Sequence, residues 1–101
     1  MFTLVSKDIK MQIGQIVYSK KGRDKALPFV VCKIEDEYLY LSDGKLRKIE
    51  NPKKKKIMHV SKTNYVDSNL STQLENFETT QKKVKNSDIM SAIKVFLNKG
   101  V

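Results

Sequence analysis

The sequence predicts a mainly β fold, in which a small five-stranded barrel is followed by a C-terminal helical hairpin. Short segments rich in β-branched and aromatic residues recur between closely spaced turns in the first two thirds of the chain. From Asp67 onward the apolar residues recur at the spacing of an α-helix. The length of 101 residues suits one domain with an appendage. We therefore expect an N-terminal arm or edge strand (1–12), the barrel (13–66) and a helical extension (67–101).

The first two strands of the barrel are expected at residues 13–20 and 29–35, on either side of a basic loop, KKGRDKALP. Gly14 in the first strand predicts a bulge or a sharp bend, which small barrels need at their corners. The second strand, FVVCKIE, is the most apolar, and its alternate residues point to opposite faces. We assign one of these faces to the core, with Val30, Cys32 and Ile34. The other face, which begins with Phe29, is expected to point away from the core.

A hairpin is expected next. Residues 38–42, YLYLS, alternate tyrosine with leucine after an acidic turn at Asp36 and Glu37, so the leucines are expected to point inward. The Asp-Gly dipeptide at 43–44 is preferred at the tip of a two-residue hairpin, since both residues tolerate positive φ. We therefore expect the chain to return as a strand over 45–50.

The lysine-rich segment that follows completes the predicted barrel. Pro52 is expected to end the hairpin pairing, because it offers no backbone N–H. The run KKKK at 53–56 is interpreted as a loop or a strand rim. The sequence IMHV at 57–60 is interpreted as a last short strand.

Two helices are expected after residue 67, separated by the polar connector TTQKKVKNS. In each helix apolar residues recur at helical spacing, namely Leu70, Leu74 and Phe77, then Ile89, Ile93 and Phe96. Ser87 is a suitable N-cap for the second helix, and Asp88 suits its first turn. Lys99 suits the last turn, and Gly100 lies where a C-terminal cap belongs.

Positive charge is concentrated in the predicted barrel. Lys and Arg outnumber Asp and Glu by 20 to 11, which gives a net charge of +9. Residues 45–62 carry eight basic side chains and one acid, and the loop at 20–25 forms a second basic cluster. Such charge indicates a polyanionic partner, either nucleic acid or an anionic membrane, or else a solvated surface. The predicted helices carry little net charge, so no membrane partner is expected.

The segments IGQIVYSKKGRDK, FVV, DGKLRKI and NPKKKKIMHVSKTNY resemble KOW-domain proteins, in which a basic, glycine-containing loop joins two strands. They look most similar to KOW-containing ribosomal proteins of the archaeal and eukaryotic large subunit and to small bacterial relatives. The resemblance covers roughly residues 13–66 and implies an SH3-like barrel that binds structured RNA, commonly ribosomal RNA. The chain departs from the motif at Ala26, where glycine is usual. A Cβ there disfavours positive φ and keeps a phosphate further from the backbone.

The implied RNA contacts lie in the loop at 20–25 and in the region from 45 to 65. The residues we expect to bind RNA are Lys20, Lys21, Arg23, Lys25, Lys45, Arg47, Lys48, Lys53, Lys54, Lys55, Lys56, Lys62, Asn64 and Tyr65. Lysines present flexible charges to phosphates, whereas the planar fork of Arg47 suits a bidentate contact. A plain ion pair is the alternative for Arg47. We expect the scaffold to gather these cations into a single patch.

The four tyrosines have two interpretations. Exposed rings can stack on unpaired bases. Cross-strand packing is the more common role, and we favour it for every tyrosine except Tyr65. Thr63 and Asn64 precede that tyrosine and are candidates for polar contacts to phosphate or the 2′-hydroxyl.

No catalytic site, metal site or cofactor is expected. Cys32 is the single cysteine and is interpreted as a small buried hydrophobe. His59 is the single histidine, and the positive charge near it is expected to favour its neutral form. One Cys and one His without nearby paired carboxylates cannot assemble a metal site or a nucleophile–base pair, so we do not expect an enzyme. A lone cysteine and the lack of a long apolar stretch predict a soluble, cytoplasmic protein.

Two functions are consistent with these features. The first is an RNA-binding protein whose basic loops bind structured RNA, with the ribosome as a possible site of action in translation. The alternative is a protein-interaction module that docks on a ribosomal or transcription complex through the apolar faces of its C-terminal helices.

Overall fold

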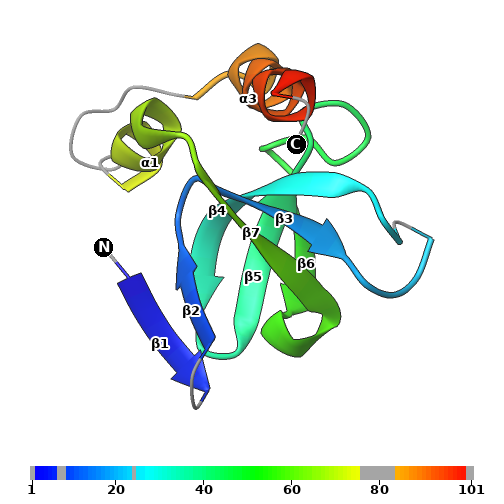
Figure 1. Cartoon of the computed structure of the whole chain (residues 1–101), viewed down its shortest axis with the longest axis vertical. Helices are drawn as coiled ribbons and strands as arrows, with labels where there is room; N and C mark the ends of the chain where they lie inside the picture. Colours follow the sequence, from blue (N-terminus) through cyan, green and yellow to red (C-terminus); the bar gives the residue numbers. More distant parts are fainter. Residues whose placement is uncertain (1, 7–8, 24, 76–83, 100–101) are drawn as a thin grey trace.

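A computed structural model of the chain describes residues 2–6, 9–23, 25–75 and 84–99, and Figure 1 shows their arrangement. The strands are β1 (Phe2–Ser6), β2 (Ile9–Gln12), β3 (Gln15–Ser19), β4 (Pro28–Glu35), β5 (Tyr38–Ser42), β6 (Lys53–Lys56) and β7 (Val60–Val66). The helices are the short 3₁₀-helix η1 (Ile57–His59) and the α-helices α1 (Ser68–Glu75) and α3 (Asn86–Asn98).

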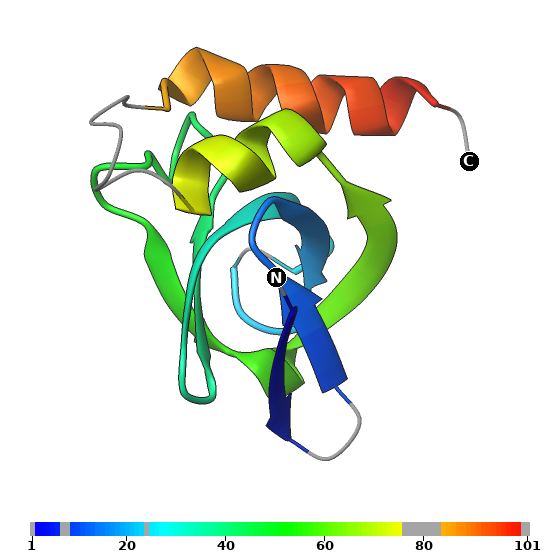
Figure 2. The same ribbon diagram turned by 90° about the vertical axis from the view of Figure 1, so that its left-hand side faces the viewer.

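Five of the strands form one antiparallel sheet in the order β6-β5-β4-β3-β7, and β1 pairs with β2 in a separate two-stranded sheet. Figure 2 shows that the five-stranded sheet is strongly curved. Among the described residues β6 and β7 lie at its two edges, so the sheet is open. The predicted mainly β fold with two C-terminal helices is confirmed. Closure into a barrel stays a prediction.

The sheet buries apolar side chains on both of its faces. One cluster fills the inside of the curve and contains Met11, Val17, Phe29, Val31, Leu39, Leu41, Ile57 and Val60. The other lies between the sheet and the helices and contains Ile16, Val30, Leu70, Val84, Ile89, Ala92 and Ile93. Helices cover one face and the sheet curls around the other, so strands β3 and β4 in the middle are apolar on both sides.

The predicted faces of β4 are wrong in part. Phe29 and Val31 belong to the cluster inside the curved sheet, whereas Val30 faces the helices, with Cys32 packed beside it. Ile34 nevertheless packs against the inner cluster. The pairing register of β4 with β5 shifts between Val31 and Lys33, and such an irregularity exchanges the faces of the residues beyond it.

The predicted strand at 45–50 is absent from the structure. The carboxylate of Asp43 accepts hydrogen bonds from the backbone N–H groups of Lys45 (2.9 Å) and Arg47 (2.8 Å). The N–H of Asp43 in turn donates to the carbonyl of Arg47 (3.0 Å). An Asp side chain that bonds to its own following backbone closes a compact loop in competition with a strand.

The lysine run is a strand. β6 pairs with β5 in full register, from Tyr38 opposite Lys56 to Leu41 opposite Lys53. Pro52 therefore precedes a strand and does not end one. The expected strand at 57–60 is also wrong, since η1 occupies Ile57–His59 and β7 begins only at Val60.

The two helices lie close to the predicted positions. Leu70 in α1 and Ile89 and Ile93 in α3 are buried, as their spacing predicts. Helix α3 begins before Ser87, because the Asp88 carboxylate accepts from the N–H of Lys85 (3.0 Å) and Lys85 is the N-cap. Ser87 is thus not the cap. Lys99 is the C-cap, and the predicted roles of Phe77 and Gly100 lie outside the described residues.

Other predicted details are confirmed. Residues 38–42 form a strand whose leucines are buried, and the turn before it lies at Asp36 and Glu37. Gly14 lies at a bend between β2 and β3, where its N–H donates to the carbonyl of Val31 (2.8 Å). Within the expected N-terminal arm or edge strand, residues 2–6 and 9–12 form two strands that pair with each other.

Candidate functional site

The basic loop between β3 and β4 is held in shape by its own backbone. Ala26 N–H donates to the carbonyl of Ser19 (2.8 Å), and Lys25 N–H donates to that of Gly22 (3.2 Å). The hydroxyl of Ser19 donates to the carbonyl of Lys21 (2.9 Å). The side chains of Lys20, Lys21, Arg23 and Lys25 are exposed. The described part of the loop therefore presents its cations from a backbone that these hydrogen bonds hold.

The loop lies against the lysine strand. Lys55 is buried, with 8% of its surface exposed, and its ammonium donates to the backbone carbonyl of Lys21 (2.6 Å). The N–H of Lys20 donates to the carbonyl of His59 (2.9 Å). Two segments more than thirty positions apart in the sequence thus meet through these bonds. Lys55 was expected to bind RNA, but its ammonium is directed inward and attaches the loop to β6.

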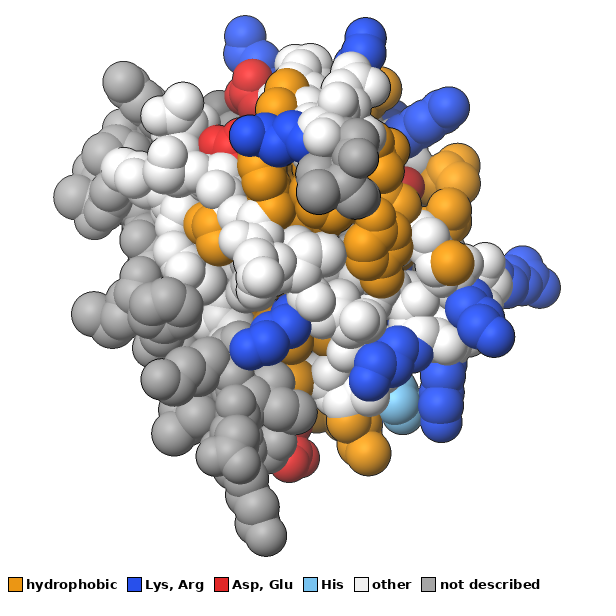
Figure 3. Space-filling view, in the orientation of Figure 1, with side chains coloured by type: hydrophobic (Ala, Val, Ile, Leu, Met, Phe, Trp, Pro, Cys, Tyr) orange, Lys and Arg blue, Asp and Glu red, His pale blue; other side chains and the backbone are white. Residues whose placement is uncertain are grey.

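His59 lies among the cations that these contacts bring together. Partial burial lowers its pKa most, and the charges of Lys21, Lys56, Lys55 and Lys20 lower it further. We call Lys20, Lys21, Lys56 and His59 the lysine–histidine cluster. Figure 3 shows blue Lys and Arg side chains near the pale-blue histidine. The expectation of a neutral histidine near a basic surface is confirmed in direction, although burial is the larger cause.

The outer face of β4, β5 and β6 carries a ladder of lysines and tyrosines. The Lys54 ammonium lies 4.5 Å from the centre of the Tyr38 ring and 6.0 Å from that of Tyr40. The Lys33 ammonium lies 5.4 Å from the Tyr40 ring and 3.3 Å from the Glu35 carboxylate. Its hydrogen bond and its charge hold the pKa of Glu35 below the ordinary value. The two tyrosines are cross-strand partners here, as we expected.

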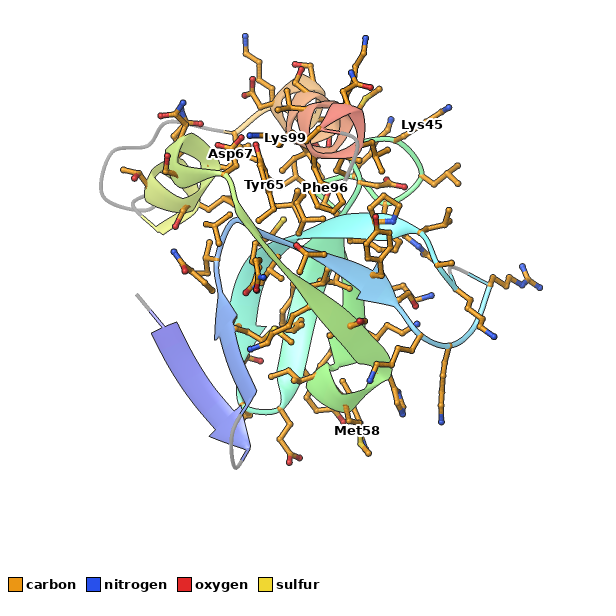
Figure 4. All side chains as sticks on the ribbon, in the orientation of Figure 1. Lys45, Met58, Tyr65, Asp67, Phe96 and Lys99 are labelled. Atoms are coloured by element: carbon orange, nitrogen blue, oxygen red, sulfur yellow. The ribbon has the colours of Figure 1, made fainter. Side chains whose placement is uncertain are left out.

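Lys45, Arg47 and Lys48 lie in the loop next to α3, away from the lysine–histidine cluster. The N–H of Ile49 donates to the Asn86 side chain at the start of α3 (2.8 Å), which anchors this loop to the helix. In Figure 4 Lys45 lies beside α3, whereas Met58 of η1 lies at the other end of the sheet. The fourteen predicted residues therefore do not form one patch.

Tyr65 belongs to an aromatic group between β7 and α3. Its ring centre lies 5.5 Å from that of Phe96, which lies 6.0 Å from that of Tyr18. The Lys99 ammonium lies 5.3 Å from the Tyr65 ring (Figure 4). Sequence reasoning placed Phe96 on the apolar face of its helix but did not connect it with the tyrosines. The ring of Tyr65 is half-buried in this packing.

The remaining predicted residues of β7 are polar and near its middle. Lys62 and Asn64 are exposed, and the hydroxyl of Thr63 between them donates to the carbonyl of Ile16 (2.7 Å). Lys53, at the start of β6, is half-buried. Lys62 and Asn64 keep side chains available for a partner, whereas Thr63 is engaged within the sheet.

The single cysteine lies in β4 and is half-buried. Burial raises the pKa of the Cys32 thiol to about 12, so the thiolate that a nucleophile requires is disfavoured. Over the described ranges no three His, Cys, Asp or Glu side chains are grouped so as to hold a metal ion. Neither α1 nor α3, the α-helices of the described part, is long and apolar enough to cross a membrane.

Comparison of the sequence with models of protein families and with curated proteins found no match. The geometry of the described side chains therefore carries the functional argument.

Proposed function

We propose that this chain binds structured RNA, with ribosomal RNA as the expected class, through the lysine–histidine cluster and the exposed cations of the adjoining loop. The observation that carries the proposal is the convergence of the loop and the lysine strand around His59, held by the bond from Lys55 to the carbonyl of Lys21. Several ammonium groups on a fixed backbone suit a phosphate chain, whose positions are set by geometry and not by base identity.

The cost of keeping these charges together supports the same function. Four lysines lower the pKa of His59, so like charges repel there when no anion is bound. A phosphate chain would relieve this repulsion and release its own counterions, which favours binding strongly at low salt.

The local backbone supports the resemblance to KOW proteins. A strand, a basic loop and a second strand follow one another as β3, the loop and β4, and the two strands pair antiparallel. Ala26 adopts φ +67°, the conformation that glycine would favour at the position where the motif usually has it. The Cβ of Ala26 therefore does not prevent the positive φ, although this conformation is less favourable for alanine than for glycine. We extend the proposal to an SH3-like barrel, of which the curved five-stranded sheet forms the wall.

The proposal is tested by measuring binding of a fluorescent RNA hairpin as a function of salt. Replacing Lys20, Lys21 and Lys56 with glutamine should weaken binding about tenfold or more, and should reduce the slope of log K against log[salt] by about 2–3. The matched control replaces Lys85, Lys94 and Lys99 of the α3 region, which removes the same charge. Equal losses in the two variants would show that only net charge matters, and would refute the assigned surface.

A further inference from the structure

A groove of about 310 Å³ lies between α3 and the loop that contains Asp43 and Lys45. Its floor and walls are mostly apolar, with Leu27 and Pro28 on one side and Met90, Ile93 and Leu97 of α3 on the other. The volume is at the lower end of the range for small-molecule sites, about 300–1,000 Å³. The groove therefore suits a few side chains of a polypeptide better than a large ligand.

The apolar residues of the groove are more exposed than packing within the chain requires. Leu27, Met90 and Leu97 keep 42%, 45% and 53% of their surfaces exposed, whereas Ile93 between them is 9% exposed. The α3 residues fall at i, i+3 and i+7, so they form one stripe along the helix. Figure 3 shows hydrophobic side chains gathered around α3. Such a stripe is the surface that another helix packs against.

The rim of the groove is positive. Lys45 and Lys94 line it and are both exposed. Asp43 also lines it, but its carboxylate already accepts hydrogen bonds from the N–H groups of Lys45 and Arg47. The carboxylate keeps its charge, so the rim carries a net charge of +1, and its two exposed ammonium groups are the ones that attract carboxylates.

We propose that this groove binds an amphipathic helix of another protein, with its apolar stripe on Met90, Ile93 and Leu97 and with acidic residues facing Lys45 and Lys94. RNA fits the groove poorly, because its lining contains no aromatic ring on which a base could stack. A second copy fits poorly too, since it carries a net charge of +9 and would place lysines against lysines.

The test uses two synthetic helical peptides with the same leucine stripe, one flanked by glutamates and the other by lysines. Methyl-labelled Met and Leu residues of the intact protein are followed by NMR during titration. The glutamate peptide should shift the methyl signals of Leu27, Met90 and Leu97 and should bind about tenfold or more tightly than the lysine peptide.

Two substitutions make the test specific. Leu97→Gln should abolish the shifts, whereas Val95→Gln should leave them unchanged, because Val95 is similarly exposed (48%) but lies on a different side of α3. Replacing Lys45 and Lys94 with glutamine should remove the preference for glutamates. Equal binding of both peptides would overturn the proposal. So would methyl shifts caused by an RNA hairpin, or shifts that depend only on protein concentration, which would indicate self-association.

Discussion

The lysine–histidine cluster and the α3 groove both present exposed lysines, but the neighbours of those lysines differ. In the cluster, Lys20 and Lys21 of a loop held by backbone hydrogen bonds lie near His59 of η1, as does Lys56 of β6. In the groove two lysines border aliphatic side chains. The first arrangement gives a diffuse positive field that suits phosphates, and the second gives an apolar site with a charge preference at its edge. From this comparison we expect the neighbours of a lysine, and not its charge alone, to determine which partner it binds.

The largest loss of stability that distinguishes the two regions is expected from Gly44→Ala, next to the α3 groove. Gly44 has φ +76°, and a Cβ there would collide with the backbone carbonyl oxygen of Asn86 at the start of α3. We expect the free energy of unfolding to fall by about 2–4 kcal/mol, from the positive φ and the clash together. Urea denaturation measures it.

Gly22→Ala is the counterpart of this substitution at the cluster. Gly22 has φ +85°, but a Cβ there would meet only the Lys55 ammonium nitrogen at 3.6 Å. Only the cost of the positive φ remains, about 1–2 kcal/mol. An equal loss in the two variants would show that contact with α3 does not distinguish the regions.

The next effect concerns the bond that holds the cluster together. Lys55→Met keeps the buried stem but removes the ammonium from the carbonyl of Lys21. A hydrogen bond to a charged group is worth about 1.5–3 kcal/mol, so stability should fall by an amount of that order, and RNA binding should weaken with it. Thermal denaturation and RNA titration check both.

Lys56→Met is the matched control for the stability measurement, because Lys56 is exposed on the same strand. It is no control for RNA binding, since Lys56 belongs to the lysine–histidine cluster. Its stability should change by about 0.5 kcal/mol or less, as for other surface substitutions. If this control is destabilised as much as Lys55→Met, the hydrogen bond from Lys55 has no special role.

The cluster should also make stability depend on pH. The pKa of His59 is lowered in the folded chain, so the unfolded chain binds more protons around the ordinary value of about 6.5. Stability should therefore fall as the pH drops through that value, and should level off below the lowered pKa. His59→Gln should remove this dependence, which urea denaturation across pH measures.

NMR titration of the imidazole tests the cause directly. Added salt screens the lysines and should raise the pKa of His59, and a bound RNA hairpin should raise it more. A pKa at or above the ordinary value in low salt would contradict the proposed cluster.

The smallest change in stability, a gain, is expected from Ala26→Gly. Ala26 has φ +67°, which costs a residue with a Cβ about 1–2 kcal/mol, while glycine costs more conformational entropy on folding. The net gain in stability should be about 0.5–1 kcal/mol. Asp36→Gly is the control, because Asp36 also has a positive φ (54°) but is of a type that tolerates it better. A loss of stability in Ala26→Gly would exclude strain at this position.

Much of the fold could be predicted because its residues alternate or recur visibly. Tyrosine and leucine alternate in β5, and apolar residues recur every three or four positions in α3. Four identical lysines show no alternation of polar and apolar residues, so the sequence pattern could not predict strand β6. In the structure Lys54 and Lys56 are exposed while Lys55 is buried, which a long flexible side chain with a polar end allows.

The candidate site was harder to predict than the fold. The basic loop and the lysine run were identified from charge, and their meeting at His59 required the pairing of distant strands. Lys45, Arg47 and Lys48 were assigned to the same patch from their charge and from the resemblance to KOW proteins, and the Asp-Gly dipeptide predicted that they lie on a returning strand. The side chain of Asp43 closed a local loop instead, and this placed Lys45 beside α3. The Asp-Gly dipeptide is compatible with both a two-residue hairpin and a compact loop closed by the Asp43 side chain, so it could not decide between them.

The hydrogen bond from the Lys55 ammonium is accepted by the main-chain carbonyl oxygen of residue 21, and every amino acid supplies such an oxygen. The identity of residue 21 can therefore change, to an acid, an arginine or a hydroxyl, without loosening the attachment of its loop. Anchoring and ligand selectivity are separable at this position, so an engineer could redesign the binding chemistry of the loop while its conformation is retained.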